Sequence, residues 1–149
     1  MPIKSFRGQI ASTAIDTISL HTNDGSIGYR IVKLQCVTNQ PSAYDVEGIF
    51  KIYKIPQTVA SITADINFSD PTLLACSYNT FGNHPYEVTN VTTIFDGEIF
   101  NQDIDITYVD NGGNTRPMNY YIELEQVRLD LSENTVATLK DIRNIATPW

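Results

Sequence analysis

Residues 91–129 constrain the fold of this chain more than any other stretch, because two β-rich runs flank its densest turn signal. That signal is the sequence DNGGN at residues 110–114. In residues 103–108, and again in residues 118–125, apolar and polar side chains alternate. A period of two is typical of a strand with one buried face and one solvated face. We therefore expect the two runs to pair as an antiparallel hairpin with a long loop.

Short β-rich runs separated by polar turns also fill the rest of the chain. They are residues 3–10, 15–21, 27–37, 48–55, 86–95 and 98–100, with a weaker candidate at 58–68. In the longest run, alternation predicts that Val32, Leu34 and Cys36 share the buried face. This pattern predicts a mainly β protein, a single antiparallel β-sandwich domain over residues 1–149 with a jelly-roll-like path.

Two segments favour short helices within this β-rich chain. Ser69-Asp70-Pro71 combines a capping side chain with proline at a first helical position, which predicts a helix over residues 72–78. Apolar residues recur at every third position in residues 136–145. A short amphipathic helix fits that spacing best, and a terminal strand is the alternative because several side chains there are β-branched.

Length and charge exclude several classes of partner. A chain of 149 residues is long enough to bury a core without staples. Its 10 basic and 17 acidic residues give a net charge of -7, which argues against binding nucleic acid. No apolar run approaches the roughly 20 residues of a membrane-spanning helix. Residues 1–10 lack the apolar stretch of a secretory signal, so we expect synthesis in the cytoplasm.

The residues that most often carry chemistry are few and isolated. His21 and His84 lack neighbours at the spacing of a zinc site. Cys36 and Cys76 are far apart and outside any C-x-x-C pattern, so we expect free buried thiols. No G-x-S-x-G motif marks a nucleophilic serine. We therefore predict no catalytic residue, no metal ligand and no cofactor.

The acidic residues are the one cluster that leaves a choice open. Asp96, Glu98, Asp103 and Asp105 lie close in sequence, and Asp110 precedes the glycine-rich turn. Alternating acids are typical of the solvated face of an antiparallel strand, which is the reading we favour. A calcium site and acid–base catalysis on sugars are the alternatives.

Aromatic residues supply the candidate contact surface. Tyrosine and phenylalanine at loop ends suit protein interfaces because they offer a large contact area at low entropic cost. The predicted interface residues are Phe6, Tyr44, Tyr78, Phe81, Tyr86 and the terminal Trp149. The alternative role for the loop aromatics is to cover the ends of the sandwich.

Several phrases of the chain resemble small uncharacterised proteins encoded by marine tailed bacteriophages. These phrases are IFDGEIFNQDIDIT (94–107), NYYIELEQVRL (119–129), ATLKDIRN (137–144), SFRGQI (5–10) and DGSIGYRIVKLQ (24–35). They are strand and turn sequences, so no site residue can be carried over. The resemblance implies a virion structural protein, a capsid-associated decoration or minor capsid subunit located in the virion. Such a subunit would form homo-oligomers and contact the major capsid or another virion protein.

Two other functions stay open at this point. Jelly-roll sandwiches with loop tyrosines also serve as carbohydrate-binding modules, in some cases with structural calcium. A small hydrolase would use the acids of residues 96–105.

Overall fold

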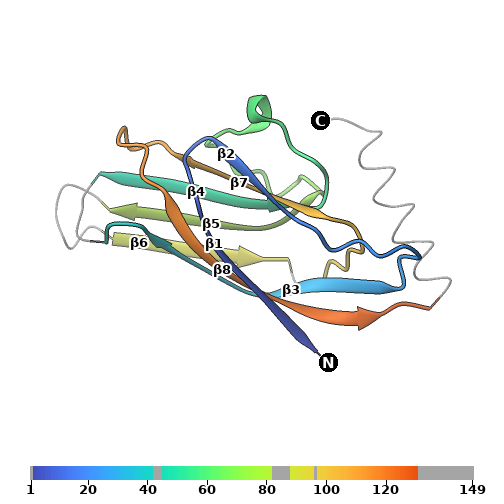
Figure 1. The fold of residues 1–149 in the computed structure, drawn as a ribbon. Helices are drawn as coiled ribbons and strands as arrows, with labels where there is room; N and C mark the ends of the chain where they lie inside the picture. The colour runs from blue at the N-terminus through green and yellow to red at the C-terminus, as the bar shows by residue number, and fades with distance from the viewer. Residues whose placement is uncertain (1, 42–44, 82–87, 96, 131–149) are drawn as a thin grey trace.

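The computed structural model describes residues 2–41, 45–81, 88–95 and 97–130, which form two antiparallel sheets packed face to face (Figure 1). The strands are β1 (Ile3–Ile10), β2 (Ala14–Ile18), β3 (Ile27–Thr38), β4 (Val46–Tyr53), β5 (Leu73–Phe81), β6 (Val88–Ile94), β7 (Ile104–Asp110) and β8 (Met118–Arg128). A short 3-10 helix, η1 (Val59–Ser61), lies between β4 and β5. None of the helical segments in the described ranges is long and apolar enough to cross a membrane.

The strand order is that of a jelly roll with one pairing changed. One sheet has the order β1-β8-β3 and the other the order β2-β7-β4-β5-β6. In a jelly roll, the first four strands pair with the last four in reverse order. The pairs β1–β8, β2–β7 and β4–β5 follow this rule. The remaining jelly-roll pair would be β3–β6, but β6 pairs with β5 at the edge of the five-stranded sheet. The predicted fold class, a mainly β protein with an antiparallel β-sandwich, is confirmed.

The predicted hairpin between residues 103–108 and 118–125 is wrong. These segments are β7 and β8, and they belong to different sheets. The two strands lie in opposite sheets, and Ile104 and Ile106 of β7 and Ile122 of β8 are fully buried in the shared core. The alternation correctly identified their buried faces. It carries no information about which strand lies alongside.

The predicted helix over residues 72–78 is also wrong, because this segment is the start of β5. Asp70 does cap a turn, since its Oδ1 accepts hydrogen bonds from the backbone N–H and the hydroxyl of Thr72 at 2.8 and 2.6 Å. The chain then enters the sheet between β4 and β6. Residues 72–77 are buried on both sides, so the period of two that marks a half-exposed strand is missing.

Smaller departures from the predicted elements follow the same logic. Residues 58–68 form η1 and loop rather than a strand, and residues 98–100 contribute only an isolated bridge between Phe100 and Tyr29. The predicted helix at 136–145 lies outside the described residues.

A β-bulge in β3 decides which of its side chains are exposed. The register against β8 shifts between Ile31 and Lys33, so Val32 is exposed rather than buried as the alternation predicted. Ile31 faces the core in place of Val32, and Leu34 and Cys36 face the core as predicted. A bulge adds one residue to a strand and reverses the faces beyond it.

The outer sides of the two sheets differ in how they are covered. Residues 54–72, with η1, lie over the five-stranded sheet (Figure 1). Lys51 of β4 is buried beneath them, where its amine donates to the carbonyl oxygen of Asp65 at 2.7 Å. Gln57 N–H donates to Asp105 of β7 at 2.8 Å. No comparable segment among the described residues crosses the outer side of the three-stranded sheet (Figure 1).

Candidate binding surface

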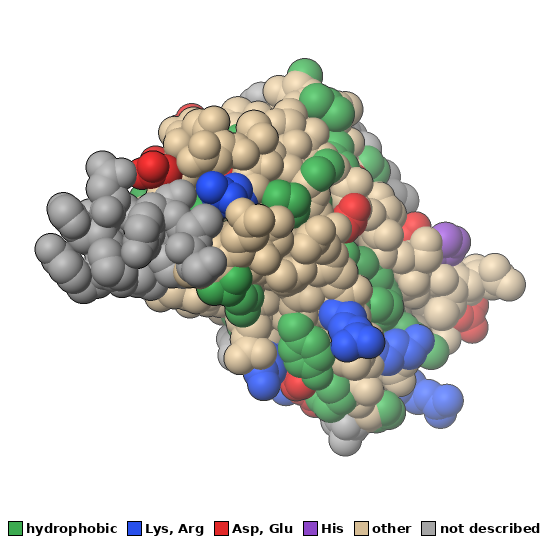
Figure 2. Space-filling view, turned by 60° about the vertical axis from the view of Figure 1, so that its left-hand side comes forward, with side chains coloured by type: hydrophobic (Ala, Val, Ile, Leu, Met, Phe, Trp, Pro, Cys, Tyr) green, Lys and Arg blue, Asp and Glu red, His purple; other side chains and the backbone are tan. Residues whose placement is uncertain are grey.

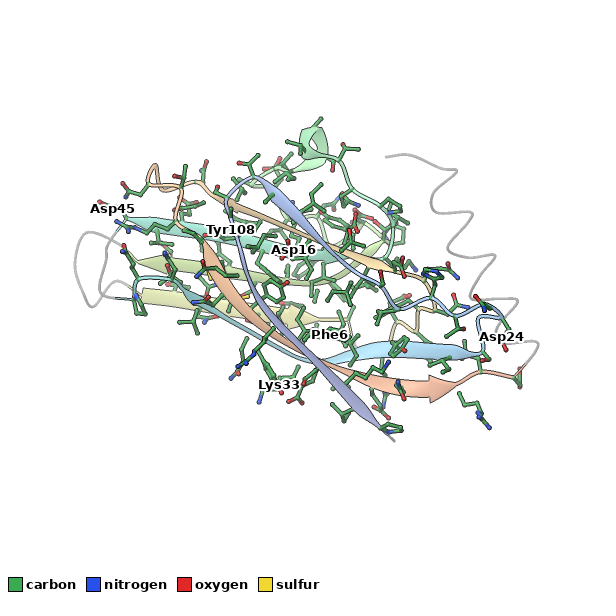
Figure 3. The ribbon with its side chains drawn as sticks, viewed as in Figure 1. Phe6, Asp16, Asp24, Lys33, Asp45 and Tyr108 are labelled. Carbon is green, nitrogen blue, oxygen red and sulfur yellow. The ribbon has the colours of Figure 1, made fainter. Side chains whose placement is uncertain are left out.

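The outward side chains of β1, β8 and β3 form the surface that we call the outer face. They are Ile3, Ser5, Arg7 and Gln9 of β1, Asn119, Tyr121, Glu123 and Glu125 of β8, and Arg30, Lys33, Gln35 and Val37 of β3. The residues between them point inward, as the burial of Ile10, Ile122 and Leu34 requires. Figure 3 shows Lys33 extending away from the two layers, whereas Tyr108 lies between them.

The register of the strands sets the side chains of the outer face in rows. Arg7, Tyr121 and Gln35 form one row across the three strands. Gln9, Asn119 and Val37 form the next. In Figure 2, Lys and Arg side chains gather with hydrophobic ones on the lower part of the surface, at the height of the three-stranded sheet in Figure 1.

An open hollow of about 570 Å³ lies across these two rows. It is lined by Arg7, Gly8, Gln35, Val37, Asn119, Tyr120 and Tyr121. Its size falls within the range of small-ligand sites in proteins. Val37, with 55% of its surface exposed, supplies an apolar patch beside the amide groups of Gln35 and Asn119.

Tyr121, at the centre of the hollow's lining, is held by two neighbours. Its hydroxyl donates to Glu123 Oε2 at 2.7 Å, and the Lys33 amine lies 5.7 Å from the centre of its ring. The hydrogen bond to Glu123 raises the pKa of Tyr121 above its ordinary value of 10.0, so the hydroxyl stays protonated at neutral pH. Tyr121 is therefore a preordered side chain on the surface.

Tyr120 forms the floor of the hollow by passing beneath β1. Its hydroxyl donates to Asp16 Oδ2 of β2 at 2.8 Å, which links the two sheets. A Cβ at Gly8 would lie only 2.7 Å from the Tyr120 hydroxyl oxygen, so only glycine permits this approach. Burial raises the pKa of Tyr120 well above its usual range.

Arg7 differs from the other cations of the outer face, Arg30 and Lys33, in having no ionic or aromatic partner among the described residues. Arg30 forms an ion pair with Glu125 at 2.8 Å, and Glu123 accepts the Tyr121 hydroxyl. Arg7 makes neither an ion pair nor a hydrogen bond with any described residue. An exposed guanidinium beside a hollow stands out in a chain with a net charge of -7.

Asp103 and Asp105 of the acidic cluster accept hydrogen bonds that hold the fold together. Asp103 precedes β7, and its Oδ1 accepts from the backbone N–H groups of Leu20 and His21 at 2.8 and 3.0 Å. Asp105 is buried rather than solvated as expected, and it accepts from the Thr17 hydroxyl at 2.7 Å and from Gln57 N–H. These carboxylates fasten neighbouring segments to β7.

The other acids of the cluster lie elsewhere. Glu98 contacts the buried Lys54 amine at 3.4 Å, and Asp110 caps the turn after β7. Asp96 lies outside the described residues. Among the residues that the structure describes, no group of three or more His, Cys, Asp or Glu side chains is placed to hold a metal ion.

Replacing Asp103 with asparagine is expected to flatten the acid dependence of stability. Burial works to raise the pKa of Asp103, but hydrogen bonds from His21 and Leu20 outweigh it and hold the pKa below 3.8. A carboxyl group whose pKa falls on folding adds stability that is present above its unfolded pKa and lost as pH drops through the folded value. The thermal midpoint of the wild type should therefore fall more steeply below about pH 4 than that of Asp103→Asn, by roughly 2 °C. Parallel curves for the two proteins would contradict this assignment.

Both cysteines are free and buried, as the sequence predicted. Cys36 lies in β3 and Cys76 in β5, so they belong to different sheets. Burial raises the pKa of Cys36 to about 12 and also raises the pKa of Cys76. Both thiols are therefore protonated and unreactive at neutral pH.

Of the predicted interface residues, the structure describes the side chains of Phe6 and Tyr78. Phe6 is half-buried and packs against the core from β1, and Tyr78 is half-buried in β5. Phe81 ends β5, but its side chain lies outside the described part, as do Tyr44, Tyr86 and Trp149. The prediction for these residues stays untested.

Sequence reasoning missed the residues that line the hollow. Alternation alone placed Asn119 and Tyr121 on the solvent side of their strand. Finding Arg7 and Gln35 beside Tyr121 required the register of β1 and β3 against β8.

Searches of protein-family models, of curated proteins and of solved structures gave no match to this chain.

Proposed function

We propose that this chain is a non-enzymatic structural protein of a virion, a capsid-associated subunit that acts through protein contacts. The observation that carries the proposal is the strand order, which follows that of a jelly roll except at β6; jelly rolls recur in viral capsid domains. The structural roles of the acids and thiols support the proposal. Asp103, Asp105 and Asp110 accept hydrogen bonds from backbone and side-chain donors, and both cysteines are buried. The resemblance to phage-encoded proteins points the same way.

We assign attachment to the exposed aromatic notch around Phe68. Phe68 is 58% exposed, yet its ring is fixed by an edge-to-face contact with Phe95 at 5.2 Å. A small hollow of about 120 Å³ lies beside it, lined also by Pro71 and Leu73. Rigid aromatic side chains beside a pocket are typical hot spots of protein interfaces. The occupant that we propose is a shell protein of the virion.

Many copies of this small contact, made at once, would suffice for stable attachment to a capsid. A capsid presents many identical sites, and a symmetric oligomer of this chain would engage several of them at once. Linked weak contacts then yield strong attachment without any new interaction.

Replacing Phe68 with serine is expected to reduce the occupancy of this protein on purified particles at least about tenfold, which is the effect of losing one interface hot spot. The occupancy would be measured by quantitative mass spectrometry and by imaging of particles assembled with each variant. Val91→Ser is the matched control, because Val91 is an exposed apolar residue of β6 outside the notch. Absence of the wild-type protein from purified particles would overturn the proposal.

A second candidate function, a carbohydrate-binding module, is favoured by the hollow on the outer face. Jelly rolls also occur as lectin domains. The lining combines one ordered aromatic ring, two amide side chains and an unpaired arginine.

A further inference from the structure

We propose that the hollow on the outer face binds saccharides that carry a carboxylate group, with Arg7 as the residue that recognises the acid. This inference rests on the second candidate function, carbohydrate binding, and it does not depend on attachment to a capsid.

The position of the hollow restricts how any ligand can be held. It is centred on β8, whose backbone is hydrogen-bonded to β1 on one side and to β3 on the other. Along the rows that line the hollow, the β8 backbone is paired on both sides and offers no free edge to an added peptide strand. On this face recognition therefore relies on side chains, and those of Arg7, Gln35 and Asn119 carry polar atoms.

The state of the charges selects for an anion. Arg30 is neutralised by Glu125 and Lys33 lies over the ring of Tyr121, whereas Arg7 has no partner among the described residues. A guanidinium binds a carboxylate through two parallel hydrogen bonds, which supply both strength and orientation. Because the chain carries a net charge of -7, attraction for an anionic ligand must come from a local cation such as Arg7.

The remaining lining suits a sugar ring. An amide side chain both donates and accepts hydrogen bonds, as sugar hydroxyl groups do. Asn119 uses its Oδ1 to accept from Gln9 at 3.0 Å, which orients its NH₂ group as a donor, and Gln35 is exposed. Val37 and the ring of Tyr121 offer apolar surface to the C–H groups of a sugar.

The experiment compares carboxylated and neutral saccharides on the full chain. Sialyllactose and trigalacturonate would be titrated by calorimetry beside lactose and galactotriose, after an array of both classes has been screened. We expect binding to the two acids, at least tenfold weaker binding to their neutral counterparts, and weaker binding of the acids at high salt.

Two variants test the role of Arg7 itself. Arg7→Gln should lower affinity for the carboxylated saccharides about ten- to a hundredfold, because a charge-assisted bidentate contact is lost. Arg128→Gln removes the same charge from an exposed position of β8 outside the hollow and should leave affinity unchanged. Gln35→Ala should weaken binding of acidic and neutral sugars alike. Unchanged unfolding midpoints would show that all three variants fold.

Several outcomes would overturn the inference. They are an absence of binding to any carboxylated saccharide, equal losses in Arg7→Gln and Arg128→Gln, and tighter binding of a hexaglutamate peptide than of the acidic sugars. Selective binding of neutral sugars would remove the role of Arg7 and leave the carbohydrate-binding function standing. Binding of no saccharide at all would remove both, while the measurement of particle occupancy would be unaffected.

Discussion

Replacing Asp110 with alanine is expected to lower the free energy of unfolding by about 3 kcal/mol. Asp110 is only 5% exposed, and its carboxylate accepts from three backbone N–H groups. Glu47 and Gly112 donate to Oδ1 at 3.1 and 2.9 Å, and Arg116 donates to Oδ2 at 2.8 Å. Alanine would leave these donors without an acceptor at the point where the chain crosses from one sheet to the other. Urea denaturation followed by circular dichroism would measure the loss.

Two further variants separate the cap from a general effect of mutation at this turn. Asp110→Asn keeps one oxygen that can accept from Glu47 and Gly112 but places an NH₂ group against the Arg116 donor, so we expect an intermediate loss. Asn111→Ala changes an exposed neighbour and should stay within about 0.5 kcal/mol of the wild type. A loss for Asp110→Ala no greater than that for Asn111→Ala would refute the assigned role.

Replacing Phe50 with alanine is expected to cost about 3–5 kcal/mol of stability. Phe50 in β4 is 0% exposed, and its ring centre lies 5.5 Å from that of Tyr120 in the opposite sheet. The substitution removes buried apolar surface and leaves a cavity that the two rigid sheets cannot close. It also withdraws support from the residue that forms the floor of the hollow.

Phe68→Ala is the matched control for this loss, because the same side chain is deleted from a mainly exposed position. Its only aromatic contact among the described residues is with Phe95, so we expect a cost of about 1 kcal/mol or less. Similar unfolding midpoints for the Phe50 and Phe68 variants would mean that the core does not depend on the contact between Phe50 and Tyr120.

Much of the architecture was predictable because side-chain alternation follows directly from strand geometry. Together with β-rich composition, it located every strand except β5 and gave the sandwich class. Alternation failed where burial is not one-sided, as in β5, and where a bulge shifts the register, as at Val32. It also failed to assign neighbours, because β7 and β8 present the same pattern whether they pair or face each other across a core.

The candidate binding surface was harder to predict for a related reason. Arg7, Gln35 and Tyr121 are distant in sequence and adjacent only through the pairing of β8 with both β1 and β3. Nothing local distinguishes Arg7 from any other exposed arginine. Asp103 and Asp105 suggested a possible joint site because they are close in sequence. In the structure they bind different segments of the chain.

The central position of β8 in the three-stranded sheet also sets the order in which the molecule can assemble. Ile3 pairs with Glu125, so nearly the whole described chain lies between the partners of this one ladder. During synthesis β1 leaves the ribosome before β8. Until β8 has been made, β1 lacks its partner in the sheet. Closing such a long loop is slow compared with pairing β4 and β5, which are consecutive strands of the other sheet. The surface that carries the hollow can therefore form only after β8 has been translated.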